Sequence, residues 1–283
     1  MRASRIWLLL ILPSSLILLG GFLLPMLGLG EESFRLFTPG RVGAVAGAPL
    51  TLNNYLELAT SGFLDFVIET LRISLIATLI GLLIGFPMAW WIARRLPRAG
   101  RAIAIGFLIA MVLLSVLVRT YALELTFGSV GLLRGVLRAL EIQPNGRGYI
   151  ECLVTAGLLH SVLPVTALTL LGTVQNLDHR LTDAAQSLGA PAWRAHLSIT
   201  VPLCMPGLLA AFLISFTFSI SAFVIPMVLG KGRVLFLSNL IYTRFSEIAD
   251  YPSGAAISVF MLVIALFFVV VVSNIAGRQG RKA

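Results

Sequence analysis

The residues of this sequence that are best suited to binding a partner lie together in one polar stretch, from Asp178 to Pro202. Asp178 can accept hydrogen bonds from the free N–H groups of a first helical turn. Gly189 can adopt the left-handed conformation that ends a helix, and Pro191 favours the start of another. A helix, a glycine turn and a second helix with a charged face form a unit that a second protein can bind. A solvated linker is the plain alternative.

Motifs of catalysis and of nucleotide binding do not occur in the sequence. Gly230 and Lys231 lack the upstream glycine and the following hydroxyl residue of a phosphate-binding loop. The three His and two Cys are scattered, so we expect neither a metal site nor a disulfide. We therefore predict no catalytic residue, although the sequence alone leaves an intramembrane serine enzyme open.

The elements that must position the polar stretch are membrane-spanning helices. Of the 283 residues, 58% are hydrophobic and 12% charged, against about 25% charged in soluble domains. Six apolar runs are long enough to cross a hydrocarbon core of about 30 Å. The sequence thus predicts an all-α, polytopic membrane protein with a single transmembrane domain over residues 1–283 and a polar loop over 176–205. The predicted spans are 7–29, 71–93, 102–118, 153–174, 207–229 and 255–276.

The formal charge of +9 is an orientation signal rather than a sign of nucleic-acid binding. With six spans, the termini and the polar loop share one side, which carries eleven basic and two acidic residues. The other side carries ten of each. Because basic residues accumulate in cytoplasmic loops, we expect both termini and the polar loop in the cytoplasm, and the N-terminal run to be an uncleaved anchor.

Some polar side chains fall inside the predicted spans. His160 lies seven residues inside its span, and an ionisable residue at that depth suggests a pathway. Ser219 and Phe223 belong to a run that mixes hydroxyl and aromatic residues, where hydroxyls face other helices or water. Hydrogen bonding between packed helices explains these residues equally well. Outside the spans, residues 50–66 and 131–140 are expected to form helices at the membrane surface.

The polar stretch also resembles a known family. Its residues are similar to the E-A-A-x3-G-x9-I-x-L-P loop of the membrane subunits of binding-protein-dependent ABC importers, with Asp for Glu and Val for Leu. The matching residues are Asp183, Ala184, Ala185, Gly189, Ile199, Val201 and Pro202. The resemblance implies a type I ABC importer permease whose loop seats on a cytoplasmic ATPase. It assigns the contacts to Asp183, Ala184, Ala185, Gly189 and Pro202, with Trp193, Arg194 and His196 as further contacts.

The segments around 119–137 and 203–258 resemble the spermidine/putrescine group of permeases. This implies polyamine import across the bacterial inner membrane with two ATPase subunits, a second six-span permease and a periplasmic binding protein. The chain itself would bind lipid but no cofactor, with ATP and Mg on the ATPases. Acidic and aromatic groups would suit a polycation, and we expect the path to include Tyr121, Glu124, His160, Ser219, Phe223 and Asp250. Importers of opines, amino-acid-like compounds, iron or phosphonate share these features, and a stand-alone secondary carrier stays open.

Overall fold

The computed structural model describes residues 12–40, 48–178 and 180–280, and side chains except those of residue 61 and residues 275–280. The described part is helical apart from turns, loops and one isolated bridge between Arg35 and Leu50. The chain divides into two units: residues 1–65 with 240–264, and residues 66–239 with 265–283. The start of the predicted first span and both chain ends lie outside the described residues.

Four helices are long and apolar enough to cross a membrane, and two bent helix pairs raise the number to six if each pair is one span. The bend is 92° in the first pair and 69° in the second. The four single helices are Leu12–Glu32, Gly62–Arg94, Arg147–Gln175 and Tyr251–Asn274. The first bent pair is Arg98–Leu113 with Val116–Phe127, and the second is Ala192–Leu203 with Met205–Ile220.

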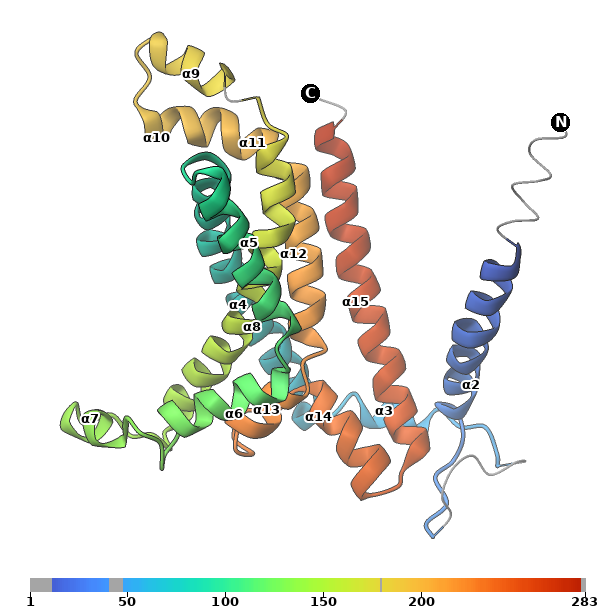
Figure 1. The fold of residues 1–283 in the computed structure, drawn as a ribbon. Coiled ribbons are helices and arrows are strands. Elements are labelled where there is room, and N and C mark those ends of the chain that lie inside the picture. Colours follow the sequence, from blue (N-terminus) through green and yellow to red (C-terminus); the bar gives the residue numbers. More distant parts are fainter. Residues whose placement is uncertain (1–11, 41–47, 179, 281–283) are drawn as a thin grey trace, which may run out of the picture. The chain divides into compact units, whose positions relative to one another are not determined.

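Within residues 66–239, the helices are named as in Figure 1. They are α4 (Ser61–Arg94, which begins in the other unit), α5 (Arg98–Leu113), α6 (Val116–Phe127), α7 (Arg134–Ala139), α8 (Arg147–Gln175), α9 (Arg180–Ser187), α10 (Ala192–Ala195), α11 (Val201–Leu203), α12 (Met205–Ile220), α13 (Val224–Leu229) and α14 (Leu237–Tyr242, which ends in the other unit). A π-helical turn, His196–Thr200, joins α10 to α11.

The helix α8 is the centre of this unit because small residues let α4 and α12 approach it closely. A Cβ at Gly85 of α4 would lie 2.9 Å from Thr166 of α8, and a Cβ at Gly207 of α12 would lie 2.2 Å from Thr173 of α8. Between these contacts the buried hydroxyls of Thr166 and Ser215 share a hydrogen bond of 2.7 Å. Small and hydroxyl residues at helix contacts are typical of membrane proteins.

The predicted span 102–118 is bent in the structure. The helix α5 ends at Leu113, Leu114 and Ser115 are extended, and α6 begins at Val116. The side chains of Val116 and Leu123 on α6 pack against a buried cluster that includes Ile225. Packing against α13 and α8 therefore fixes the direction of α6. These contacts cannot be predicted from the apolar run alone.

The predicted span 207–229 is divided into α12 and α13. The Ser221 hydroxyl donates to the Thr217 carbonyl at 2.9 Å, and Pro226 has no N–H with which to continue the helix. The Ala222 carbonyl, which Pro226 leaves without a helical donor, accepts from Ser238 Oγ at 2.6 Å. The Phe223 carbonyl accepts from the Met227 N–H at 3.1 Å and also from Asn239 Nδ2 at 3.2 Å.

The unit of residues 1–65 and 240–264 holds the helical run from Leu12 to Glu32, which includes a π-helical turn. The segment 50–66, expected to be one surface helix, forms two helices instead. The first, α3, covers Asn53–Glu57, and the second is the start of α4 at Ser61, with Thr60 between them. A buried Asn54 holds α3 in place by donating to the Ser33 and Arg35 carbonyls at 2.9 Å each. The elements are the π-turn Leu19–Leu23, α2 (Leu24–Glu32), α3 (Asn53–Glu57), the π-turn Thr243–Glu247 and the first part of α15 (Tyr251–Gly280).

The surface helix expected at 131–140 is present in a shorter form, α7, over Arg134–Ala139. Leu137 is buried, whereas Val136 is exposed. The described residues of the remaining predicted spans, 71–93, 153–174 and 255–276, lie within α4, α8 and α15.

Candidate functional site: the coupling unit and a basic pocket

The polar stretch folds into the predicted helix, glycine turn and helix, which we call the coupling unit (residues 178–203). At its start, the Arg180 N–H donates to Asp178 Oδ1 at 3.0 Å, which confirms the predicted cap. At the end of α9, Gly189 has a φ of +91°. The Gly189 N–H donates to the Gln186 carbonyl at 2.9 Å, and the Ala190 N–H donates to the Ala185 carbonyl at 3.1 Å. This pair of bonds is the glycine-dependent helix ending known as the Schellman motif.

The second half of the coupling unit is fixed to α4 by His196. The His196 ring meets the Trp90 ring edge to face, with centroids 4.9 Å apart. His196 Nδ1 and Thr200 Oγ1 are 3.1 Å apart, and Thr200 is buried. His196 is thus half-buried and directed at α4, where it positions the coupling unit.

An apolar surface lies on the outside of the coupling unit. Leu188 is 90% exposed, Trp193 66% and Leu197 60%. Exposed large apolar side chains are typical of surfaces that contact another protein or a membrane. Of the predicted contact residues, Asp183, Ala184, Gly189, Trp193, Arg194 and Pro202 are exposed, whereas Ala185 and His196 are half-buried.

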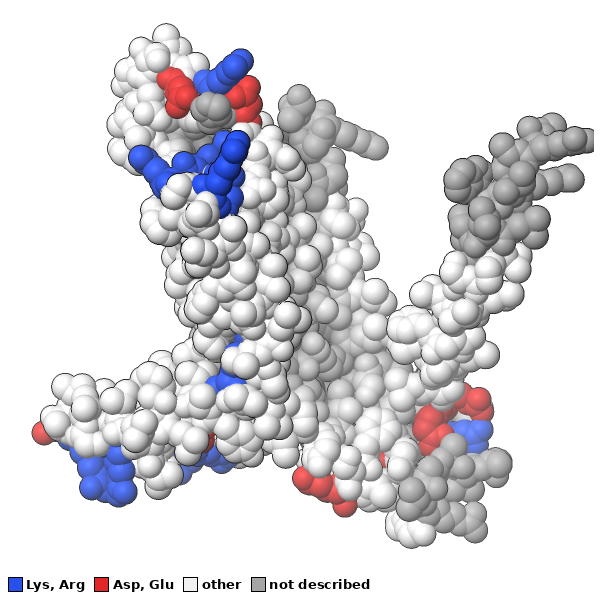
Figure 2. All heavy atoms as spheres, viewed as in Figure 1, with Lys and Arg blue, Asp and Glu red and all other residues white. Residues whose placement is uncertain are grey.

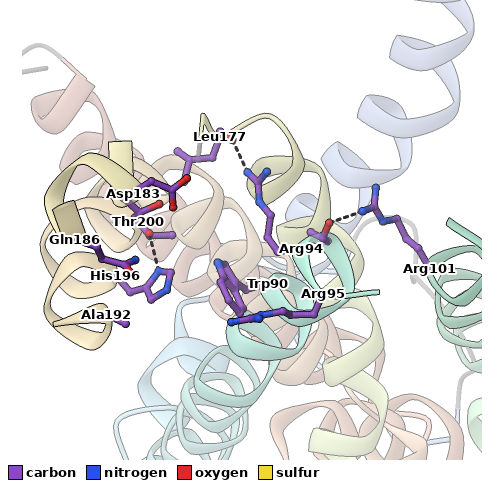
Figure 3. A pocket seen from close by; sticks show the side chains of 12 residues that line it. Trp90, Arg94, Arg95, Arg101, Leu177, Asp183, Gln186, Ala192, His196 and Thr200 are labelled. Carbon is purple, nitrogen blue, oxygen red and sulfur yellow. Dashed lines mark hydrogen bonds between the residues drawn. The ribbon is translucent and has the colours of Figure 1, made fainter. Parts of the chain in front are cut away.

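A polar cavity of about 510 Å³ lies between the coupling unit and the ends of α4, α5 and α8, and we call it the basic pocket (Figure 3). Arg94, Arg95, Arg101, Asp183 and His196 are among its lining residues. In the space-filling view, Lys and Arg gather at this end of α4 and α5 (Figure 2). Among the described residues that line the pocket, Asp183 carries the only carboxylate.

Each arginine of the basic pocket has a neutral partner. Arg94 donates to the Leu177 carbonyl and, at 2.7 Å, to the Val174 carbonyl. These carbonyls belong to the end of α8, where the helix dipole favours a positive charge. Arg101 donates to the Ala93 carbonyl at 2.6 Å. The Arg95 guanidinium lies over the Trp90 ring, 5.7 Å from its centroid.

The sequence does not predict this pocket, because three arginines near the end of a predicted span indicate only the orientation of the chain in the membrane. Arg94 is the last residue of α4, Arg95 follows it, and Arg101 lies in the first turn of α5. Their convergence therefore depends on the α4–α5 turn and on the return of the coupling unit. Arg119 directly follows the predicted span 102–118 and is one of the ten basic residues expected on the other side of the membrane. It is 6% exposed, and its Nε and Nη1 have no hydrogen-bond partner within the described residues.

The residues expected along a transport path are divided between the two units. Glu124 of α6 forms an ion pair with Lys231 at 2.8 Å. Asp250 belongs to the other unit, where it pairs with Arg244 at 3.3 Å and accepts from the Ser253 N–H at 3.1 Å. Both carboxylates therefore have local structural roles.

The other expected path residues lie in the unit that contains α8. Tyr121 is exposed on α6, and Phe223 is half-buried at the break between α12 and α13. Ser219 of α12 is fully buried, and its hydroxyl has no hydrogen-bond partner within the part of the chain described.

His160 lines an apolar cavity of about 270 Å³ between α4, α5 and α8, together with Trp91, Ala104, Phe107 and Met111 among others. We call this the apolar cavity. The His160 side chain is also close enough to Arg119 for the two to interact electrostatically. No metal-binding group of three or more His, Cys, Asp or Glu residues occurs within the described residues.

The all-helical fold with bent spans and a capped coupling unit defines a polytopic membrane permease. Residues 75–282 match the family model described as the binding-protein-dependent transport system inner membrane component. The chain belongs to this family, and it is therefore an inner-membrane permease subunit of an ABC importer. It is a transport subunit rather than an enzyme, as predicted from the missing nucleotide site.

Individual proteins agree with this assignment. The spermidine/putrescine transport system permease protein PotB of Escherichia coli (strain K12) is 31% identical over 216 residues, which cover 76% of this chain and 78% of the relative. A crystal structure of a bacterial ABC transporter involved in the import of the acidic polysaccharide alginate has a TM-score of 0.76 at 18% identity and covers 98% of this chain and 97% of that chain. The same kind of transporter in complex with an alginate pentasaccharide-bound periplasmic protein has a TM-score of 0.74 at 18% identity, covering 98% and 96%. The fold is thus that of type I importer permeases.

Proposed function

We propose that the chain imports polyamines such as spermidine and putrescine, as the names of its curated relatives suggest for those proteins. A periplasmic binding protein delivers the polyamine, and a second six-span permease completes the path. Two cytoplasmic ATPases supply the energy and hold the ATP and Mg, while this chain binds no cofactor. The coupling unit and both termini face the cytoplasm, in agreement with the excess of basic residues on that side.

The observation that supports ATPase coupling most directly is the exposed apolar surface of the coupling unit. Leu188 and Trp193 are both more than half exposed, and the Gly189 turn fixes the angle between the helices that carry them. A lever with a fixed bend can transmit ATPase closure to the spans. The second permease and the binding protein rest on family likeness and on the solved alginate transporter complex.

The transport path is proposed to run along the face of the chain that carries Tyr121 and Phe223, next to the second permease, with Ser219 and His160 supporting this face from within the helices. Glu124 contributes negative charge at one end of this path even though Lys231 neutralises part of it. A polycation requires further acidic or aromatic groups, and we assign these to the partner subunit.

The test is affinity purification of the chain from mild-detergent extracts of its native membrane, with co-purifying proteins identified by mass. The variant is Leu188→Glu, and the matched control is Leu132→Glu, because Leu188 and Leu132 are 90% and 86% exposed. Both variants should fold equally well. The wild type and Leu132→Glu should retain an ATPase and a second permease, whereas Leu188→Glu should lose the ATPase. An ATPase that stays bound to Leu188→Glu would contradict coupling through this unit.

The substrate is tested separately by uptake of labelled putrescine and spermidine into cells that lack their own polyamine importers but express the whole transporter. We expect uptake that stops with Leu188→Glu and continues with Leu132→Glu. An intact complex without polyamine uptake would refute the substrate but not the coupling, and opines, amino-acid-like compounds, iron and phosphonate would be tested next. Uptake that continues without any ATPase would instead favour a secondary carrier.

A further inference from the structure

We propose that the basic pocket binds the phosphate group of an anionic phospholipid and that the apolar cavity takes up an acyl chain of the same lipid. Both cavities are built by the unit of residues 66–239. The inference does not depend on the proposed substrate or on the ATPase.

The charge of the basic pocket calls for an anion. Arg94, Arg95 and Arg101 carry three positive charges, and none of them has an ion pair with a carboxylate among the described residues. Asp183 offsets one charge at most. A guanidinium has five N–H donors, and the bonds of Arg94 and Arg101 to backbone carbonyls all start from one Nη2 atom of each side chain. Arginine donors left free around a polar cavity match the oxygens of a phosphate.

The position of the pocket favours a lipid over a soluble phosphate. Residues three and four apart lie on one face of a helix. Arg95 directly follows α4, and its N–H donates to the Trp91 carbonyl one turn earlier at 2.9 Å. Ala104 lies one turn after Arg101 on α5, and both Trp91 and Ala104 line the apolar cavity. The two arginines therefore lie one helical turn from the apolar cavity.

The apolar cavity is open to the surroundings of the chain. At its rim, Trp91 is 53% and Phe107 62% exposed. His160 is the only ionisable residue among the described residues that line it. Trp90 and Trp91 belong to the aromatic residues that membrane proteins place at the level of lipid headgroups. Basic pockets between membrane helices are known to bind anionic headgroups, and this arrangement has the polar and apolar parts that a phospholipid requires.

The experiment is native mass spectrometry of the full chain in mild detergent. Phosphatidylglycerol and phosphatidylethanolamine with identical acyl chains are added in equal amounts. The wild type should retain phosphatidylglycerol in preference to phosphatidylethanolamine. The double variant Arg95→Gln/Arg101→Gln should bind phosphatidylglycerol about twenty-five-fold more weakly, since each arginine near a membrane surface contributes about fivefold. Arg98→Gln is the matched control, because Arg98 is exposed on the same turn but does not line the pocket.

A second set of measurements separates a lipid from a free phosphate. Ala104→Phe fills the apolar cavity and leaves the arginines in place, so it should lose phosphatidylglycerol. Met111→Phe is a second variant at the other end of the same cavity. Circular dichroism and a single elution peak show that each variant is folded.

Inorganic phosphate added at millimolar concentration should leave phosphatidylglycerol bound to the wild type. Displacement by phosphate, together with unchanged binding by the folded cavity variants, would replace the lipid site by a free-phosphate site. Equal binding by the wild type and the Arg95/Arg101 variant would overturn the proposal. The chain is isolated in this assay, so neither result bears on ATPase coupling or polyamine uptake.

Discussion

The contact of α12 with α8 at Gly207 allows a sharp test of the packing. A Cβ added at Gly207 would lie 2.2 Å from Thr173 Oγ1, 2.7 Å from Cγ2 and 2.8 Å from Cβ. Ordinary carbon contacts lie at 3.4 to 4 Å. Rotation of the Thr173 side chain cannot move its own Cβ, so the two helices must separate in Gly207→Ala. Overpacking of this kind costs about 1 to 3 kcal/mol.

Gly172→Ala is the matched control on α8, one residue from Thr173. A Cβ at Gly172 meets nothing within 4 Å. Alanine is favoured over glycine inside a helix by about 0.5 to 1 kcal/mol, so this variant should be slightly more stable than the wild type. The two substitutions are chemically identical and should change the free energy of unfolding in opposite directions.

The assay is denaturant titration of the purified chain in mild detergent, followed by helical circular dichroism. Gly207→Ala should unfold at lower denaturant than the wild type, and Gly172→Ala at equal or higher denaturant. Thr173→Ala combined with Gly207→Ala should recover part of the loss, because it removes Oγ1 and Cγ2 but leaves the Cβ. If Gly207→Ala were as stable as Gly172→Ala, the close approach of α12 and α8 would be refuted.

Three further predictions concern local contacts. Thr166→Val leaves the Ser215 hydroxyl without its 2.7 Å partner, and should cost about 0.6 to 1.7 kcal/mol in the same titration; no loss would mean that Ser215 finds another acceptor. Glu124→Gln leaves the partly buried Lys231 without its carboxylate and should destabilise the chain by about 1 to 3 kcal/mol, with Lys231→Met in the same chain restoring stability; failure of this rescue would count against the pair. Gly189→Ala forces a residue with a Cβ to a φ of +91°. This variant should retain less ATPase in the affinity purification than Gly189→Asn, because asparagine tolerates this conformation better. Equal amounts of ATPase with both variants would show that the turn is not strained.

The sequence predicted those features that depend on neighbouring residues. The cap at Asp178 and the glycine ending at Gly189 involve residues two to five apart, so local patterns were sufficient. The membrane class followed from composition alone. Family membership followed from the spacing of Asp183, Ala184, Ala185 and Gly189, which is a local pattern as well.

Features that depend on distant residues escaped prediction. At the break after Ile220, Ser238 satisfies the Ala222 carbonyl and Asn239 adds a second donor to the Phe223 carbonyl, each from sixteen residues away. The apolar run from 207 to 229 shows only that the segment avoids water. In the same way, the basic pocket requires arginines from two helices to meet the coupling unit. Neither arrangement can be predicted from the spacing of hydrophobic residues along the chain.

The exposed apolar side chains of the coupling unit have a consequence for the synthesis of the chain. A copy made without its ATPase presents Leu188 and Trp193 to water, as a misfolded protein would. Chaperones and proteases recognise such surfaces, and in the proposed complex the ATPase would cover them. The cellular amount of the permease would then follow the supply of its ATPase, and surplus copies would be removed without a dedicated regulator.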